Sequence, residues 1–135
     1  MIDHTAFYKC VNLTGSLIIP NSVTTIGSNA FGVCKGFDSL IMSQNIETIG
    51  WGAFLSCSSL TGTVISPQSL EQIEDKGFIG CSNIDAFQFL NPTPITYTIN
   101  MLDSGKPVIV PTEAAVTAYK SAWGTSRHTI TAASE

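Results

Sequence analysis

One short marker recurs along this chain and constrains its fold more than any other feature. Alanine or glycine is followed by phenylalanine and, after two variable residues, by cysteine, at residues 6–10, 30–34, 53–57 and 77–81. The four phenylalanines, Phe7, Phe31, Phe54 and Phe78, lie 24, 23 and 24 residues apart. A fixed period of this length is typical of a solenoid, in which each repeat forms one coil and buries its apolar face only against neighbouring coils.

Each repeat predicts the same elements in the same order. Alternating apolar residues predict short strands at residues 16–20, 39–43 and 63–67, which should pair between successive coils as a parallel sheet on one face. Residues 23–26 predict a second extended segment, and the Ala-Phe-x-x-Cys marker predicts one turn of α- or 3₁₀-helix. Leu13 and Leu17 begin the apolar columns that we expect to form the core.

The pattern weakens after Cys81. Further strands are predicted at residues 86–90 and 107–111, the second of which should close the sheet, and Met101-Leu102 replaces the Ala-Phe pair between them. Thr112 as N-cap and Gly124 as stop predict a helix over residues 113–123, which would shield the last coil from water. We therefore expect a solenoid over residues 1–111, with a partial first coil and a degenerate coil at 91–106, a capping helix over 112–124 and a tail over 125–135.

Composition restricts the partners that the chain can take. The formal net charge is −4 and the six basic residues are scattered, which argues against nucleic-acid binding. No apolar run approaches the length of about 18 residues that a membrane span needs. The first ten residues lack the basic and apolar regions of a signal peptide. Because Ile2 precedes Ala6 as Ile26 precedes Ala30, the first coil is partial, and we expect a longer parent protein with further coils upstream.

The chain has few residues that could form a catalytic or metal-binding site. Cys10, Cys34, Cys57 and Cys81 share one repeat position, so they should stack as buried free thiols; disulfides between neighbouring coils are the less favoured alternative. His4 and His128 should lie near opposite ends of the stack, which excludes a histidine-based triad or metal cluster. Glu71, Glu74 and Asp75 are interpreted as a solvated edge, with a cation site as the alternative. We therefore assign no catalytic residue, metal or cofactor.

A column of outward-facing residues is the candidate binding site. It consists of the central residue of each predicted strand, namely Ile18, Ile41, Ile65, Gln88 and Ile109. Ser16, Ser39, Ser43 and Thr63 should give it a polar rim. Two interpretations remain open: β-branched residues simply favour strands, or an exposed apolar strip marks a partner site.

Three segments of the chain carry a resemblance to a known family. LTGSLIIPNSVTTIGSNAFGVC, IETIGWGAFLSCSSLTG and SLEQIEDKGFIGCSNI resemble BspA-like leucine-rich repeats, and VIVPTEAAVTAYKSAWG resembles the strand and helix that end many members. The similarity covers about residues 2–124, as the C-terminal portion of such a protein. Departures are Gly77 in place of alanine, Ser66 in place of an inward isoleucine, and the degenerate coil.

The resemblance implies a general function. Members are bacterial cell-surface or secreted proteins without shared catalytic residues, and some bind host matrix proteins or other cells. We therefore expect a leucine-rich-repeat solenoid that acts as a non-catalytic protein-binding or adhesion module, with a protein or glycan as partner. The alternatives are a structural spacer that displays another domain, or a carbohydrate-binding module. The open first coil exposes Ile2 and Phe7, so we also expect end-to-end self-association.

Overall fold

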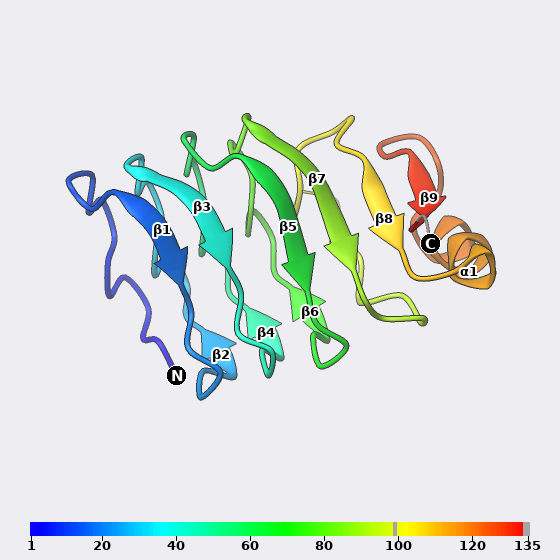
Figure 1. The fold of residues 1–135 in the computed structure, drawn as a ribbon, viewed down its shortest axis with the longest axis horizontal. Coiled ribbons are helices and arrows are strands. Elements are labelled where there is room, and N and C mark those ends of the chain that lie inside the picture. Colours follow the sequence, from blue (N-terminus) through cyan, green and yellow to red (C-terminus); the bar gives the residue numbers. More distant parts are fainter. Residues whose placement is uncertain (99, 134–135) are drawn as a thin grey trace.

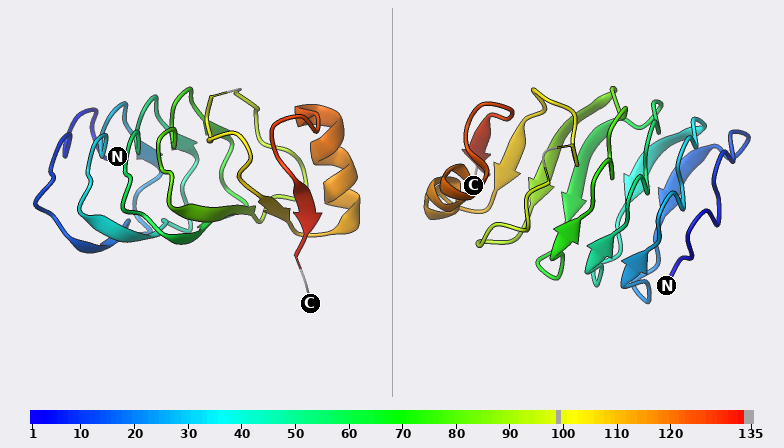
Figure 2. Two further views of the ribbon diagram at one scale, coloured as in Figure 1. Left: turned by 90° about the horizontal axis from the view of Figure 1, so that it is seen from above. Right: turned by 180° about the vertical axis from the view of Figure 1, so that it is seen from behind.

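The coils stack side by side along one axis, as the computed structural model shows for residues 1–98 and 100–133 (Figure 1). One face, called here the strand face, carries the longer strands β1 (Gly15–Ile18), β3 (Phe37–Ile41), β5 (Gly62–Ser66), β7 (Ile84–Phe89), β8 (Val108–Val110) and β9 (Ile130–Ala132). A second row holds β2 (Thr25–Ile26), β4 (Thr48–Ile49) and β6 (Gln72–Ile73). Helix α1 (Glu113–Trp123) lies across the C-terminal end of the stack (Figure 2).

The strands pair as the repeat predicts, with one interruption. All strand pairs are parallel, and equivalent residues face one another, for example Ile26 with Ile49 and Ile49 with Ile73. The strand face, however, contains two sheets rather than one: β1 pairs with β3, and the order β5-β7-β8-β9 forms the other. The prediction that neighbouring coils pair throughout is therefore wrong between β3 and β5.

The Ala-Phe-x-x-Cys segment is a series of tight turns, so the prediction of a helical turn there is wrong. Asn29 and Val33 have positive φ angles of 55° and 59°, which a right-handed helix cannot include. The N–H of Ala30 donates within its own coil to Gly27 (3.2 Å), whereas that of Phe31 donates to Ala53 in the next coil (2.8 Å). Alternate N–H groups thus bind neighbouring coils together, which a helix would prevent.

Phenylalanine rings form a continuous column through the core. Phe31 stacks on Phe54 at 5.5 Å and Phe54 on Phe78 at 4.8 Å between ring centroids. Met101 and Leu102 are fully buried, and the Met101 carbonyl accepts from the N–H of Phe78 (2.9 Å), as predicted for a substitute Ala-Phe pair. The first coil differs, because Leu13 is 43% and Phe7 41% exposed. The expectation that Leu13 is a core residue is wrong, since no strand covers it.

The cysteines form a second column of free thiols. Cys34, Cys57 and Cys81 are buried, and each thiol donates to the carbonyl of a phenylalanine in the preceding coil at 3.0, 3.1 and 3.0 Å. Burial raises the pKa of Cys34 to about 11, whereas the hydrogen bond with the Cys57 side chain, assisted by burial, raises the pKa of Cys81. Cys34 and Cys81 therefore stay protonated, and the buried thiols act as small apolar groups that also hydrogen-bond to the backbone.

Helix α1 begins and ends as predicted and is tied to the degenerate coil. The hydroxyl of Thr112 accepts from the N–H of Ala115 (3.1 Å), and Gly124 ends the helix with φ of 77°. The Tyr119 hydroxyl donates to the Asn91 carbonyl (3.1 Å), and Nε1 of Trp123 donates to the Ile95 carbonyl (3.1 Å). Burial raises the pKa of Tyr119 to about 12. The helix thus closes the stack with both packing and hydrogen bonds.

Residues beyond the helix add a strand that the sequence did not predict. β9 pairs with β8, placing Ile130 beside Val108, so the sheet does not end at residues 107–111. The segment returns past the ring of His128, which is buried and has Nδ1 2.9 Å from the carbonyl of Lys106. Nε2 of His128 is buried without a partner among the described residues. Neutral His128 with its proton on Nδ1 satisfies this geometry, whereas a second proton would have no acceptor.

The buried His128 is expected to make stability depend on pH. Burial, assisted by the charge of Arg127, lowers its pKa below the ordinary 6.5. The unfolded chain therefore takes up the proton first, so the stabilising contribution is complete above pH 6.5 and declines as pH falls toward the folded pKa. Urea unfolding between about pH 7 and pH 5 should show a smaller loss of stability for His128→Gln than for the unmodified chain. His4→Gln, at an exposed position, is the matched control, and an equal slope for all three chains would contradict the assignment.

Candidate functional site

The strand face brings the predicted site residues into one row. Ile18 lies beside Ile41, and Gln88 lies between Ile65 and Ile109, in the register of their strands. Ile18, Ile41 and Ile65 are 62%, 54% and 47% exposed, whereas Gln88 and Ile109 are half-buried. The exposed apolar surface is therefore concentrated on β1, β3 and β5, and it weakens toward the C-terminal cap.

A small cleft opens where the two sheets separate. It encloses about 180 Å³ and is lined by Leu40, Ile41, Met42, Gln44, Thr63 and Ile65, which belong to β3, β5 and the residues after β3. The backbone N–H of Thr61 still donates to the Asp38 carbonyl (2.9 Å), so the coils stay linked at the turn before the strands. The cleft places the two central isoleucines on opposite walls of one recess.

The sequence does not predict the cleft, and the lengths of the coils give no signal of it. The second coil is one residue shorter than its neighbours in the turn before β3, where Thr14-Gly15 and Thr61-Gly62 have no counterpart. In the structure, Asp38 is an extra residue of β3 opposite Gly15, a bulge that shifts the strand register. The same bulge occurs between β5 and β7, which pair, so it does not explain why the sheet divides between β3 and β5.

The polar rim differs from the prediction at one position. Ser16 and Ser39 lie on the strand face with their hydroxyl oxygens 2.6 Å apart, and Thr63 is exposed on the wall of the cleft. Ser43 instead is fully buried, and its hydroxyl donates to the Val23 carbonyl (2.7 Å). The prediction for Ser43 is wrong because the chain turns inward after Met42, and the serine supplies a hydrogen bond within the core.

The other candidate groups do not assemble into a reactive centre. Glu74 accepts the backbone N–H of Trp51 at its Oε2 (2.9 Å), so it stabilises the neighbouring coil. Within residues 1–98 and 100–133, no three of His, Cys, Asp and Glu come close enough together to hold a metal ion. His128 packs against Trp123 at the cap, whereas His4 lies in the first coil.

These features define a class of protein, and a comparison with known families specifies it. Parallel strands recurring with the repeat period and capped by one helix define a leucine-rich-repeat solenoid. Residues 1–101 match the family described as BspA type leucine rich repeat region, in six copies, so the chain belongs to the BspA-type leucine-rich-repeat family. No curated protein matches the chain.

Membership of this family indicates a general role. Leucine-rich-repeat solenoids are typically non-catalytic protein-interaction modules, and BspA-type repeats are associated with bacterial surface proteins. In the part of the chain that the structure describes, no helix has the length and apolar character needed to cross a membrane.

Proposed function

We propose that the chain is a non-catalytic adhesion module of a bacterial cell-surface or secreted protein, and that it binds its partner on the strand face. The observation that supports this proposal is the exposure of Ile18, Ile41 and Ile65 on ordered strands, with the last two on the walls of a cleft. A partner that covers the exposed half of one such isoleucine gains about 1 kcal/mol from burial of the side chain.

The cleft favours binding over the simpler explanation by strand propensity. Propensity accounts for outward isoleucines on a solvated sheet, but it gives no reason for an apolar recess beside them. Leu40 and Met42 extend the apolar wall inward from Ile41, so an apolar side chain of a partner can enter between the sheets. An apolar centre with the serine and threonine rim is the usual composition of a protein interface.

A protein partner, including a host matrix protein, suits this surface better than a glycan. The cleft contains two polar side chains, Gln44 and Thr63, among four apolar ones, and none of its lining residues is aromatic or charged. Orientation of a sugar depends on several hydrogen-bonding groups, whereas a buried aliphatic or aromatic anchor needs shape and apolar contact.

Charge placed on the cleft walls should weaken binding. The chain is tested against immobilised matrix proteins and glycans beside Ile41→Asp/Ile65→Asp, which buries two carboxylates in any complex and should weaken binding at least about tenfold. Both positions are exposed, so each substitution should change stability by only about 0.5 kcal/mol. Trp51→Asp, at an exposed apolar residue away from the strand face, is the matched control and should bind normally.

Each alternative has its own outcome in the same experiment. Equal binding by the double variant and the unsubstituted chain would show that the binding site lies outside the cleft. Binding to glycans alone would support the carbohydrate-binding alternative. An absence of binding by every chain would favour a structural spacer.

A further inference from the structure

The turn that follows β7 is one residue longer than its counterparts in the preceding coils. Gln72 lies seven residues after Ile65, and the two coils before it have the same spacing. Thr96 pairs with Gln72 as an isolated bridge, but it lies eight residues after Gln88, the partner of Ile65. The additional residue therefore falls in the stretch that contains Asn-Pro-Thr-Pro at 91–94, where the repeat pattern is lost.

This turn and the preceding coil enclose a polar pocket. Its volume is about 300 Å³, at the lower limit of the range of about 300–1,000 Å³ for ligand sites, so it admits one small ligand or one terminal unit of a larger one. Five of the lining residues have hydrogen-bonding side chains, namely Gln68, Glu71, Asn91, Thr93 and Thr96. Among the described residues that line the pocket, Glu71 alone is charged and none is aromatic.

The wall that the turn contributes is fixed by side-chain hydrogen bonds. The Asn91 amide donates to the carbonyls of Gln68 (2.9 Å) and Leu70 (2.8 Å), which joins the turn to the preceding coil. Tyr119 and Trp123 of α1 donate to further carbonyls of the turn. Because the wall is already fixed before a ligand arrives, binding requires little additional ordering of the chain.

Stability alone does not account for asparagine at position 91. Its Oδ1 is buried without a hydrogen-bond donor among the described residues, which is unfavourable. In the preceding coil, the Ser69 hydroxyl contacts the carbonyls of Gln44 (3.3 Å) and Ile46 (2.7 Å) in the same manner and leaves no second polar atom. Such a departure from the best local arrangement is expected at functional sites.

The lining residues exclude several classes of ligand. No lysine, arginine or histidine among them can neutralise a phosphate, a sulfate or a sugar acid, and the one carboxylate is too few for a divalent cation. No aromatic ring among them can stack on a planar base. A neutral ligand with several hydroxyl groups suits this set, because the amides and threonine hydroxyls donate and accept, and the carboxylate accepts.

We propose that this pocket binds a neutral saccharide unit. The Glu71 carboxylate accepts from the sugar hydroxyls, and the exposed side chains of Gln68 and Thr96 complete the hydrogen bonds. Leu70 and Ile95, which also line the pocket, provide apolar contact for the C–H groups of the sugar ring. The pocket shares no residue with the cleft between β3 and β5, so this inference does not depend on the function proposed above.

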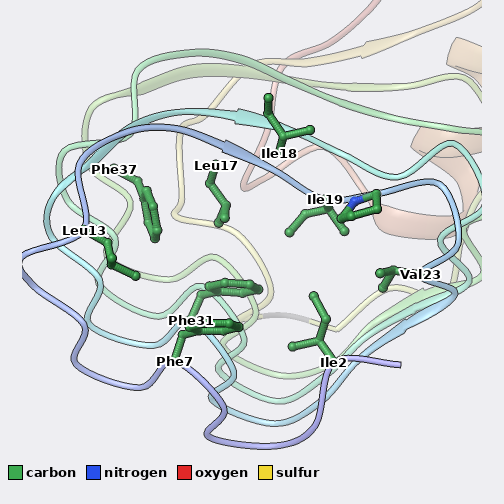
Figure 3. Close-up of a pocket in the computed structure, with 10 residues that line it drawn as sticks. Ile2, Phe7, Leu13, Leu17, Ile18, Ile19, Val23, Phe31 and Phe37 are labelled. Carbon is green, nitrogen blue, oxygen red and sulfur yellow. The ribbon is translucent and has the colours of Figure 1, made fainter.

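A recess of similar volume at the first coil differs in its lining. It encloses about 310 Å³, and Leu17 and Ile19 point from β1 toward the rings of Phe7 and Phe31 (Figure 3). Every residue that lines it is apolar, so it has no side chain that could orient a sugar by hydrogen bonds. The pocket beside Asn91 is therefore the one of the two that suits a saccharide.

The test is an NMR titration of the whole chain with the methyl glycosides of glucose, galactose, mannose and N-acetylglucosamine. At least one glycoside should bind saturably in the millimolar range, with amide shifts confined to the lining residues. Glu71→Ala/Thr96→Val should weaken this binding at least about tenfold, because it removes hydrogen-bonding groups from the pocket. Glu47→Ala/Thr48→Val makes the same changes at equivalent repeat positions outside the pocket and should bind normally.

Four results would overturn the proposal. They are an absence of binding by every glycoside, shifts that map to another surface, equal affinity of the pocket variant and the unsubstituted chain, or binding of tetramethylammonium in place of any glycoside. The shift map uses the unsubstituted chain, so it does not depend on how the variants fold. Glycoside binding should be unaffected by Ile41→Asp/Ile65→Asp, so a failure of this proposal is distinguishable from a failure of the strand-face proposal.

Discussion

Phe54→Ala is expected to lower the free energy of unfolding by about 3–5 kcal/mol, the range for removal of a large aromatic ring from a packed core. The Phe54 ring is fully buried and lies between the rings of Phe31 and Phe78. Its loss leaves a cavity in the middle of the aromatic column, and stacked backbones that are hydrogen-bonded between coils cannot close around it. Urea unfolding followed by far-UV circular dichroism measures the change.

Phe7→Ala provides a control at the same repeat position. Phe7 has one free ring face and 41% exposure, so its replacement should cost only about 1 kcal/mol, mainly through reduced apolar contact with Phe31. The ratio between the losses of unfolding free energy in the two variants tests whether the rings form one stacked column. Similar losses for Phe7→Ala and Phe54→Ala would contradict an aromatic column that is open at its first member.

Trp123→Ala is expected to destabilise the chain by a similar amount, about 3–5 kcal/mol. The indole packs edge-on against Phe89 at 5.5 Å and against Tyr119 at 4.9 Å between ring centroids. Its N–H also satisfies the carbonyl of Ile95, which would otherwise be buried unpaired. The variant should also loosen α1 and expose the last coil, measured as faster amide hydrogen exchange in Phe89 and Val110.

Trp51→Ala separates the effect of the cap from that of losing a tryptophan. Trp51 is exposed, with the ammonium of Lys76 5.3 Å from its ring centroid, and its replacement should change stability by about 0.5–1 kcal/mol. Circular dichroism is the appropriate signal, because each variant removes one of the two fluorophores. Equal destabilisation by both variants would show that α1 does not anchor the stack.

The repeat predicts most of the fold because one period assigns each side chain to a column. Phe31, Cys57 and Ile73 are buried as their repeat positions require, and the capping signals of Thr112 and Gly124 bound the helix correctly. The helical turn at the marker was wrong because apolar spacing does not report φ: Val33 adopts a left-handed conformation that β-branched residues rarely take. β9 was not predicted because its three residues lie in a polar segment. They form a strand because they pair with β8.

The sequence predicts which residues of the candidate site face outward, but it does not predict the cleft between them. Alternation along a strand suffices to place Ile18, Ile41 and Ile65 outward. The cleft between Ile41 and Ile65 depends on the distance between two coils. The hydrogen-bond pairing of the strands determines that distance, and the type of side chain does not.

The thiol column allows this fold to form without disulfide bonds. Four cysteines in an exported protein would ordinarily be read as two cross-links, because oxidising compartments favour disulfides. Here three of the four side chains are buried between coils and hydrogen-bonded to phenylalanine carbonyls. The coils need no disulfide bond to hold them together, so this stack can form in a reducing compartment as well as in an oxidising one.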